Sequence, residues 1–284
     1  MTHPDCPGPH RTSVHRESVD RVNRADGTAA AQTASGRTPV FSDDFAGFAP
    51  HPAGMVPGWA LPVTLLLIAK APIAGFAKTR LTPPFSPREA AQLAAASLLD
   101  TLAAMRGTSV QHRVVAWTGD LADAEQADEI AHALREFTVI PQRGADFGER
   151  LANAHADAAR PGLPVLQIGM DTPQLDPALL AASAIQLLTT ADAVLGPATD
   201  GGWWALGLPD PRPARLLAQV PMSTDHTGED TRNMLRRCGF HPHALPTLTD
   251  VDTYDDARTV AARCHGRFAA AVARACAADA EVLL

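Results

Sequence analysis

Lysine is almost absent from this 284-residue chain, which contains only Lys70 and Lys78 beside 22 arginines. Two lysines kept eight residues apart in an arginine-rich chain indicate a site that requires compact ammonium charges. The 24 cations are outnumbered by 31 acidic residues, so the net charge is −7 and the pI is about 5.8. A non-specific nucleic-acid binder would carry a basic stripe and a high pI, so we expect no nucleic-acid partner.

Leucine and isoleucine are missing from the first sixty residues, of which thirteen are Gly or Pro. Such a segment lacks the branched aliphatic surface that offsets chain entropy. We therefore expect a disordered leader over residues 1–60 and one α/β domain over residues 61–284. Deletion of residues 1–54 is expected to leave the melting temperature and the activity unchanged.

Long apolar runs are also missing. The longest, residues 63–69, is too short to span a bilayer, so no membrane span is expected. The leader mixes arginines with acidic residues and has no apolar core of a secretion signal, which favours a cytoplasmic protein. The four cysteines have no CxxC spacing, which is typical of reduced thiols and not of a zinc site or a disulfide framework.

From Pro62 onward, short apolar runs alternate with longer Ala-rich amphipathic stretches, a pattern typical of βα units around a mostly parallel sheet. Ser86 followed by Pro87 predicts the start of the first helix. The expected strands are 63–69, 110–117, 137–140, 164–168, 193–196, 203–208 and 241–245, and the expected helices are 87–105, 121–134, a part of 144–159, 177–188, 226–237 and 254–278.

The basic loop, defined as residues 70–81, directly follows the first expected strand, where open α/β sheets bind nucleotides. Two lysines and an arginine around a Gly that admits close backbone approach can surround a di- or triphosphate. A Walker P-loop needs Gly, Lys and Thr in direct succession, which this loop lacks. The alternative is an exposed loop whose charges are merely solvated. The loop residues predicted to bind the nucleotide are Lys70, Ala71, Pro72, Gly75, Lys78, Thr79 and Arg80.

Asp171 follows the buried strand 164–168, and a carboxylate at a strand's carboxyl end is well placed to hold Mg²⁺ on a nucleotide's phosphates. An Asx turn in Asp171-Thr172-Pro173 is an equally good interpretation. Asp250 and Asp252 lie on the same side of an extended segment, so one of them can supply a second metal ligand. The alternative for Asp252 or Thr253 is the N-cap of the last helix.

Two further segments are candidates for the acceptor side. Asp200-Gly201-Gly202 can contact a sugar hydroxyl with Trp203 as a stacking face, although Asp-Gly is also a common hairpin turn. The segment 223–226 is either a helix cap or a polar lip over the pocket that includes Ser223, with Asp225 or His226 as general base.

Four motifs in order resemble one family: Lys-Ala-Pro-x-x-Gly-x-x-Lys-Thr-Arg-Leu at 70–81, Gly-x-Asp-x-Pro-x-Leu at 169–175, Gly-Pro-x-x-Asp-Gly-Gly at 196–202 and Asp-Val-Asp-Thr at 250–253. The segments 144–151 and 220–224 also look like family segments. The family is that of the GT-A-like arsenosugar-biosynthesis and radical-SAM/selenodomain-associated glycosyltransferases. More distantly, the chain is similar to the molybdenum-cofactor and phospholactate guanylyltransferases.

The resemblance implies a three-layer α/β GT-A, or nucleotide-diphospho-sugar transferase, fold with a mixed, mostly parallel sheet flanked by helices. It implies a nucleotide over the basic loop and Mg²⁺ (or Mn²⁺) held by Asp171 and Asp252. Arg150, in one of the shared segments, is expected to bind the nucleotide.

The expected activity is Mg²⁺-dependent transfer of a sugar from an NDP-sugar to a small-molecule acceptor, with Lys78, Asp171 and Asp225 as catalytic residues. Stabilisation of the leaving nucleoside diphosphate would be the main catalytic effect. The alternative is a guanylyltransferase-like nucleotidyltransferase that releases pyrophosphate from an NTP. A third reading is a non-catalytic nucleotide-binding protein.

Overall fold

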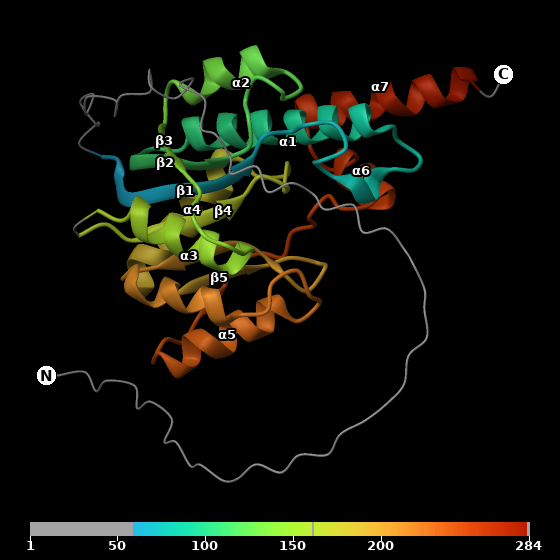
Figure 1. The fold of residues 1–284 in the computed structure, drawn as a ribbon. Coiled ribbons are helices and arrows are strands. Elements are labelled where there is room, and N and C mark those ends of the chain that lie inside the picture. Colours follow the sequence, from blue (N-terminus) through green and yellow to red (C-terminus); the bar gives the residue numbers. More distant parts are fainter. Residues whose placement is uncertain (1–58, 161, 283–284) are drawn as a thin grey trace, which may run out of the picture. The chain divides into compact units, whose positions relative to one another are not determined.

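The structure, a computed structural model, describes residues 59–160 and 162–282 (Figure 1). The leader predicted over residues 1–60 therefore lies outside the described residues, except for Trp59 and Ala60. No helix in the described part of the chain is long and apolar enough to cross a membrane.

One seven-stranded sheet forms the centre of the described domain, in the order β3-β2-β1-β4-β6-β5-β7. The strands are β1 (Leu61–Lys70), β2 (Val110–Thr118), β3 (Thr138–Pro141), β4 (Val165–Gly169), β5 (Val194–Pro197), β6 (Trp203–Leu208) and β7 (His243–Ala244). Only β6 runs antiparallel to its neighbours. β1 is buried over seven consecutive residues, which is expected for a central strand that helices cover on both faces.

Helices cover both faces of the sheet (Figure 1). On one face, α1 (Pro87–Gly107), α2 (Ala127–Leu134) and α4 (Pro177–Thr190) pack against Leu65 and Leu67 of β1. On the other face, α3 (Phe147–Ala158), η3 (Arg212–Gln219) and α5 (Thr227–Arg237) pack against Leu66 and Ile68. Since consecutive strand residues point to opposite faces, one apolar strand supplies two core layers. The predicted three-layer α/β fold with a mixed, mostly parallel sheet is confirmed.

A third apolar cluster joins the outer side of α1 to η2 (Thr79–Leu81), α6 (Tyr254–Ala261) and α7 (Arg267–Val282). It holds the end of the basic loop against the helical layer through Leu81, which is fully buried. The loop is thus anchored at its carboxyl end by packing and at its amino end by β1.

Most predicted elements are present with shifted ends, and the start of α1 is confirmed in detail. The Ser86 side chain accepts a hydrogen bond from the Glu89 backbone N–H, and the Glu89 carboxylate accepts one from Ser86. This reciprocal pair is the capping box that begins many helices. β7 has two residues where residues 241–245 were predicted, and η3 was not predicted.

The helix predicted over 121–134 begins only at Ala127. The preceding residues form turns because Asp120 accepts a hydrogen bond from the Ala122 N–H, and the Glu125 N–H donates to the carbonyl of Pro72. This second bond ties the start of α2 to the basic loop.

The helix predicted over 254–278 is in fact two helices, α6 and α7, with a break at residues 262–266. Asp100 of α1 causes the second start: its carboxylate accepts hydrogen bonds from the N–H groups of Arg267 and Phe268 at 3.0 and 2.9 Å. A Cβ on Gly266 would lie 2.7 Å from that carboxylate, so a side chain there would displace the Asp100 side chain from its capping position. A residue distant in sequence therefore caps α7.

The strand order brings polar loops together at one edge of the sheet. β1 and β4 are parallel neighbours, with Ile68 opposite Gly169, so their carboxyl ends coincide. β6 is antiparallel to β4, so its amino end lies at the same edge. The change of winding direction beside β1 is where open α/β sheets bind ligands.

Candidate functional site

A cavity of about 650 Å³ opens at this edge of the sheet, within the size range of small-molecule sites. The wall of the cavity is formed by the basic loop, by the ends of β1, β4 and β6, and by the segments 222–227 and 250–252. The polar and aromatic residues that line it include Lys70, Phe76, Lys78, Thr79, Arg80, Thr118, Gln142, Phe147, Arg150, Gln167, Asp171, Asp200, Trp203, Ser223, Thr224, Asp225, Thr227, Asp250 and Asp252.

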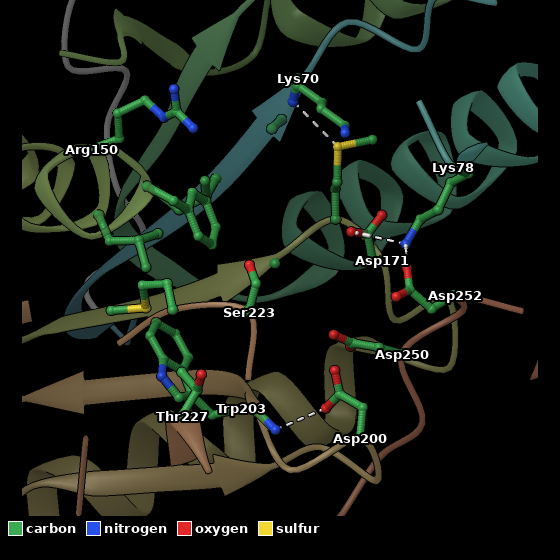
Figure 2. Close-up of a pocket in the computed structure, with 18 of the residues that line it drawn as sticks. Lys70, Lys78, Arg150, Asp171, Asp200, Trp203, Ser223, Thr227, Asp250 and Asp252 are labelled. Atoms are coloured by element: carbon green, nitrogen blue, oxygen red, sulfur yellow. Dashed lines mark hydrogen bonds and ion pairs between the residues drawn. The ribbon is translucent and has the colours of Figure 1, made fainter. Parts of the chain in front are cut away.

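Lys78 lies at the centre of the acidic side of this cavity. Its ammonium Nζ is 3.0 Å from Asp171 Oδ2 and 3.4 Å from Asp252 Oδ1 (Figure 2). The side chain is only 8% exposed, and its backbone is left-handed, with φ 53°. Burial lowers the pKa of Lys78, but the charges of Asp171 and Asp252 outweigh it and leave the pKa above its ordinary value. The lysine is therefore charged at neutral pH.

Asp252 is shared between two cations of the basic loop. Its Oδ2 accepts a hydrogen bond from Arg80 at 2.6 Å, while its Oδ1 faces Lys78. The helix cap belongs to its neighbour: Thr253 is the N-cap of α6 and forms a capping box with Asp256. Asp252 is thus not the helix cap, and its carboxylate lines the cavity.

Asp250 comes to the site with Asp252 because the Val251 N–H donates to the carbonyl of Asp171 at 3.0 Å. Burial raises the pKa of Asp250 to about 7, the charge of Asp171 adds to this increase, and Lys78 opposes it. The sequence placed Asp250 and Asp252 on the same side of an extended segment, and in the fold both half-buried residues line the cavity.

The donor set fits a divalent metal. Asp171 Oδ1 is buried and has no hydrogen-bond partner in the described part of the chain, while Oδ2 faces Lys78. Carboxylate oxygens are the ligands that Mg²⁺ and Mn²⁺ prefer. Across residues 59–160 and 162–282, however, no three His, Cys, Asp or Glu side chains form a ready metal-binding group. Asp171 and Asp252 share an ammonium group instead.

The part of the wall next to β6 carries most of the predicted acceptor residues, and Asp200 lies beside Asp250 (Figure 2). Asp200 Oδ1 accepts a hydrogen bond from the Gly202 N–H at 2.8 Å, so this carboxylate also stabilises its own turn. The Trp203 Nε1–H donates to Thr231 Oγ1 at 3.2 Å, which orients the indole at the cavity wall beside Thr227 (Figure 2). The wall thus combines an aromatic face with hydroxyl groups.

The segment 222–227 forms a lip over this wall. Ser223 has a left-handed backbone with φ 60°, and the side chain of Asp225 is 80% exposed, with His226 Nε2 at 3.5 Å from its Oδ1. The Gly228 N–H donates to the carbonyl of Gly201 at 2.8 Å and pins the lip to the Asp200 turn. The structure therefore places Ser223 and Asp225 on the cavity rim.

Lys70 and Arg150 line the side of the cavity toward β1 and α3 (Figure 2). The Arg150 guanidinium lies over the Phe147 ring, with 5.8 Å between its Cζ and the ring centroid. Its Nε is buried without a hydrogen-bond partner among the described residues. Two cations and an aromatic ring therefore line this side of the cavity.

Five predicted residues do not line the cavity: Ala71, Pro72, Gly75, Gly201 and His226. Ala71 is buried, and its N–H donates to the Thr118 carbonyl, which continues the sheet. The Pro72 carbonyl accepts from Glu125, and Gly75 is an exposed turn residue with φ 74°. Ala71, Pro72 and Gly75 therefore set the backbone path of the basic loop. Gly201 allows the segment 222–227 to approach closely, because a Cβ at this position would overlap the Asp225 carbonyl.

Gln142 is a cavity residue that the sequence analysis missed. Its side-chain Nε2 donates to the carbonyls of Ala69 and Ala116 at 2.8 and 2.9 Å and so joins the ends of β1 and β2. A polar residue directly after the short strand 137–140 was the available signal, the same one that identified Asp171. Phe147, Met222 and Thr227 are further lining residues that carried no such signal.

Residues 101–224 match a family model. It is described as "Uncharacterized protein conserved in bacteria (DUF2064)". The matched range contains Arg150, Asp171, Asp200 and Ser223, while the basic loop and the segment 250–252 lie outside it. No curated protein sequence matches this chain.

The chain is similar to several solved structures. A protein of Desulfovibrio desulfuricans G20, named as a candidate nucleotide-diphospho-sugar transferase, is 26% identical with a TM-score of 0.60, over 68% of this chain and 83% of that one. Rv0371c of Mycobacterium tuberculosis H37Rv, solved in complex with manganese, is 20% identical with a TM-score of 0.46, over 70% and 97%. A nucleotidyl transferase of Methanothermobacter is 15% identical with a TM-score of 0.43, over 70% and 95%.

Proposed function

We propose that this protein is a metal-dependent, nucleotide-utilising transferase that moves a sugar from an NDP-sugar to a small-molecule acceptor. The observation that carries the proposal is the group formed by Lys78, Asp171 and Asp252 in a cavity at the carboxyl ends of β1 and β4. Cations and carboxylates side by side at that position suit phosphates bound together with a metal.

The phosphates belong on the cationic side of the cavity in this proposal. Lys70, Lys78, Arg80 and Arg150 all line it, from the basic loop and from α3. Lysine acts as a point charge and arginine as a planar fork, so together they neutralise a diphosphate from several directions. Phe147, held under the Arg150 guanidinium, offers an aromatic face to the base.

Asp171 and Asp252 would hold Mg²⁺ or Mn²⁺, since the buried Asp171 Oδ1 lacks a partner in the described part of the chain. When bound, the metal would supply positive charge that stabilises the leaving phosphate oxygens. Lys78 and Arg80 would bind the same oxygens. Asp225, on the exposed lip, would accept the proton of the acceptor hydroxyl.

The acceptor would bind between the lip and β6. Trp203 supplies a stacking face, and Ser223 and Thr227 supply hydroxyl groups. The acceptor oxygen would attack the anomeric carbon, the bond from that carbon to the phosphate oxygen would break, and the nucleoside diphosphate would leave. The similarity to the 26% identical candidate nucleotide-diphospho-sugar transferase supports this choice.

Nucleotidyl transfer is the second candidate, favoured by the number of cations around the cavity, which suits a triphosphate. In that reaction a phosphate or carboxylate oxygen of the acceptor attacks the α-phosphorus of an NTP, and pyrophosphate leaves. The two candidates share the donor site and differ in the atom that is attacked. The narrower resemblance to arsenosugar biosynthesis, the domain limits and the cytoplasmic location stay predictions.

Product analysis tests the proposal. The full chain is incubated with Mg²⁺ or Mn²⁺ and with panels of NTPs and NDP-sugars, and the melting temperature identifies the donor that binds. Release of a nucleoside diphosphate from an NDP-sugar supports glycosyl transfer, whereas release of pyrophosphate from an NTP contradicts it and supports the second candidate.

A pair of variants tests the site. Asp171→Asn should abolish the metal-dependent rise in melting temperature with the donor, because it removes a charged oxygen ligand. Asp255→Asn is the matched control, since Asp255 is an exposed carboxylate close to Asp252 in sequence. A metal-dependent rise that survives in Asp171→Asn would show that the metal binds elsewhere.

A further inference from the structure

Lys78 is placed between the two carboxylates that the proposed function assigns to the metal. Its ammonium is 3.0 Å from Asp171 Oδ2 and 3.4 Å from Asp252 Oδ1, and Figure 2 shows it directed at both. The same function assigns Lys78 to the substrate phosphates. In the structure, the lysine is paired with the carboxylates.

A divalent cation bound to Asp171 or Asp252 would lie next to this ammonium. Like charges repel strongly at such distances where water is partly excluded, and Lys78 is 8% exposed. Arg80 adds a second positive charge on Asp252. The carboxylates of Asp171 and Asp252 are therefore already paired with cations of the protein, and a metal must compete with these cations.

We propose that Lys78 is the counter-ion of the Asp171 and Asp252 carboxylates when no ligand is bound. Phosphate and a divalent metal then bind cooperatively, because phosphate draws Lys78 away from these two carboxylates. The proposal rests on the proposed function for the identity of the anion as a phosphate. A bound phosphate pairs with Lys78 and so removes the positive charge that opposes the metal. A bound metal displaces Lys78 from the carboxylates and so makes the ammonium available to the phosphate.

The surroundings of Lys78 permit this movement. The ammonium stands on a flexible four-carbon chain. The turn before it contains Gly75, around which there is open space, and the exposed Phe76, which lines the cavity. The buried Leu81 anchors the carboxyl end of the basic loop, close to Lys78. The Lys78 side chain can therefore turn while the ends of the loop stay fixed.

Lys70 provides the matched comparison. It lines the same cavity, and no ion pair joins it to a carboxylate within residues 59–160 and 162–282. Both lysines should attract phosphate, but only Lys78 should oppose the metal. Lys78→Met and Lys70→Met should therefore both weaken phosphate binding, but only Lys78→Met should strengthen metal binding.

Metal binding without nucleotide tests the proposal directly. The full chain, Lys78→Met and Lys70→Met are titrated with Mn²⁺ alone, and free Mn²⁺ is followed by electron paramagnetic resonance. Lys78→Met should bind Mn²⁺ about tenfold or more tightly than the wild type, because one adjacent positive charge is gone. Lys70→Met should bind Mn²⁺ as the wild type does. An unchanged or weaker Mn²⁺ affinity in a folded Lys78→Met protein overturns the proposal.

Inorganic pyrophosphate is the probe for the anion. Both variants should bind it more weakly than the wild type, and in the wild type its affinity should rise with Mg²⁺ by the same factor as the Mg²⁺ affinity rises with pyrophosphate. The fits include the Mg²⁺–pyrophosphate complex that forms in solution. A smaller coupling in Lys78→Met than in Lys70→Met supports the proposal, because direct attraction between metal and phosphate is common to both variants, and equal coupling in the two contradicts it.

A measurement on the wild type guards against a misfolded variant. Because the chain has only two lysines, ¹³C-lysine labelling gives two side-chain Cε signals, which Lys70→Arg assigns. Mg²⁺ with pyrophosphate should shift the Lys78 signal. A Lys78 signal that stays in place under saturating ligands overturns the proposal. None of these measurements needs turnover, so failure of the proposed transfer reaction is detected separately.

Discussion

The buried histidine of α3 predicts a specific loss of stability in mild acid. His155 is fully buried, and neither ring nitrogen has a hydrogen-bond partner in the described residues. Burial lowers the pKa of His155 to about 4, and Gln167 opposes this only partly. In the unfolded chain its pKa would be about 6.5. Protonation of the folded protein is therefore disfavoured.

The sign and the size follow from linkage. Between pH 6.5 and 4 the unfolded chain binds a proton at His155 that the folded protein does not, so the free energy of unfolding falls as the pH falls. The full effect of about 2.5 pKa units is about 3 kcal/mol, and about 2 kcal/mol of it is lost between pH 7 and pH 5. Above pH 7 the contribution is constant.

Urea unfolding of the wild type and His155→Leu at pH 7 and pH 5 measures this contribution. The loss of stability between the two pH values should be about 2 kcal/mol smaller in the variant, since carboxylate titrations are common to both proteins and cancel. The control His132→Leu changes an exposed histidine of α2 and should keep the wild-type pH dependence. Equal pH dependence in the wild type and His155→Leu would refute the reasoning.

Two further predictions concern backbone positions set by the fold. Asp100→Ala removes the acceptor of the Arg267 and Phe268 N–H groups and should lower the free energy of unfolding by about 1–2 kcal/mol, measured by urea unfolding, with exposed Asp128→Ala as control. Gly201→Ala combines φ 88° with an overlap on the Asp225 carbonyl and should cost about 1–3 kcal/mol, more than Gly162→Ala, which has φ 77° but open space. Equal costs at the two glycines would show that the lip contact is unimportant.

Much of the fold was predictable because its signals are local. The apolar run 63–69, the Ser86-Pro87 start and the polar loops after strands all act within a few residues. The single helix predicted over 254–278 was wrong for the opposite reason: the start of α7 depends on the carboxylate of Asp100, which approaches only in the folded protein.

The candidate site was likewise predictable where local signals mark its residues, and unpredictable where contacts between distant segments decide. Lys78 and Asp171 were identified as candidates because each follows a strand that reads as buried, and the structure places both in one cavity. The sequence left open whether Asp250 or Asp252 supplies a second metal ligand, and whether Asp252 or Thr253 caps the last helix. Thr253 is the cap in the structure, Asp252 pairs with Lys78 and Arg80, and Asp250 lines the same cavity.

The sequence by itself determined the element types and the chemistry of the loops, because hydrophobic periodicity and charge are properties of short segments. The tertiary structure decided which loops meet. The order β1-β4-β6 brings the basic loop, Asp171 and Asp200 to one edge, and the hydrogen bond from Val251 to Asp171 adds the segment 250–252. Only that assembly places one of the chain's two lysines between two carboxylates, since the interaction depends on distances that no local pattern encodes.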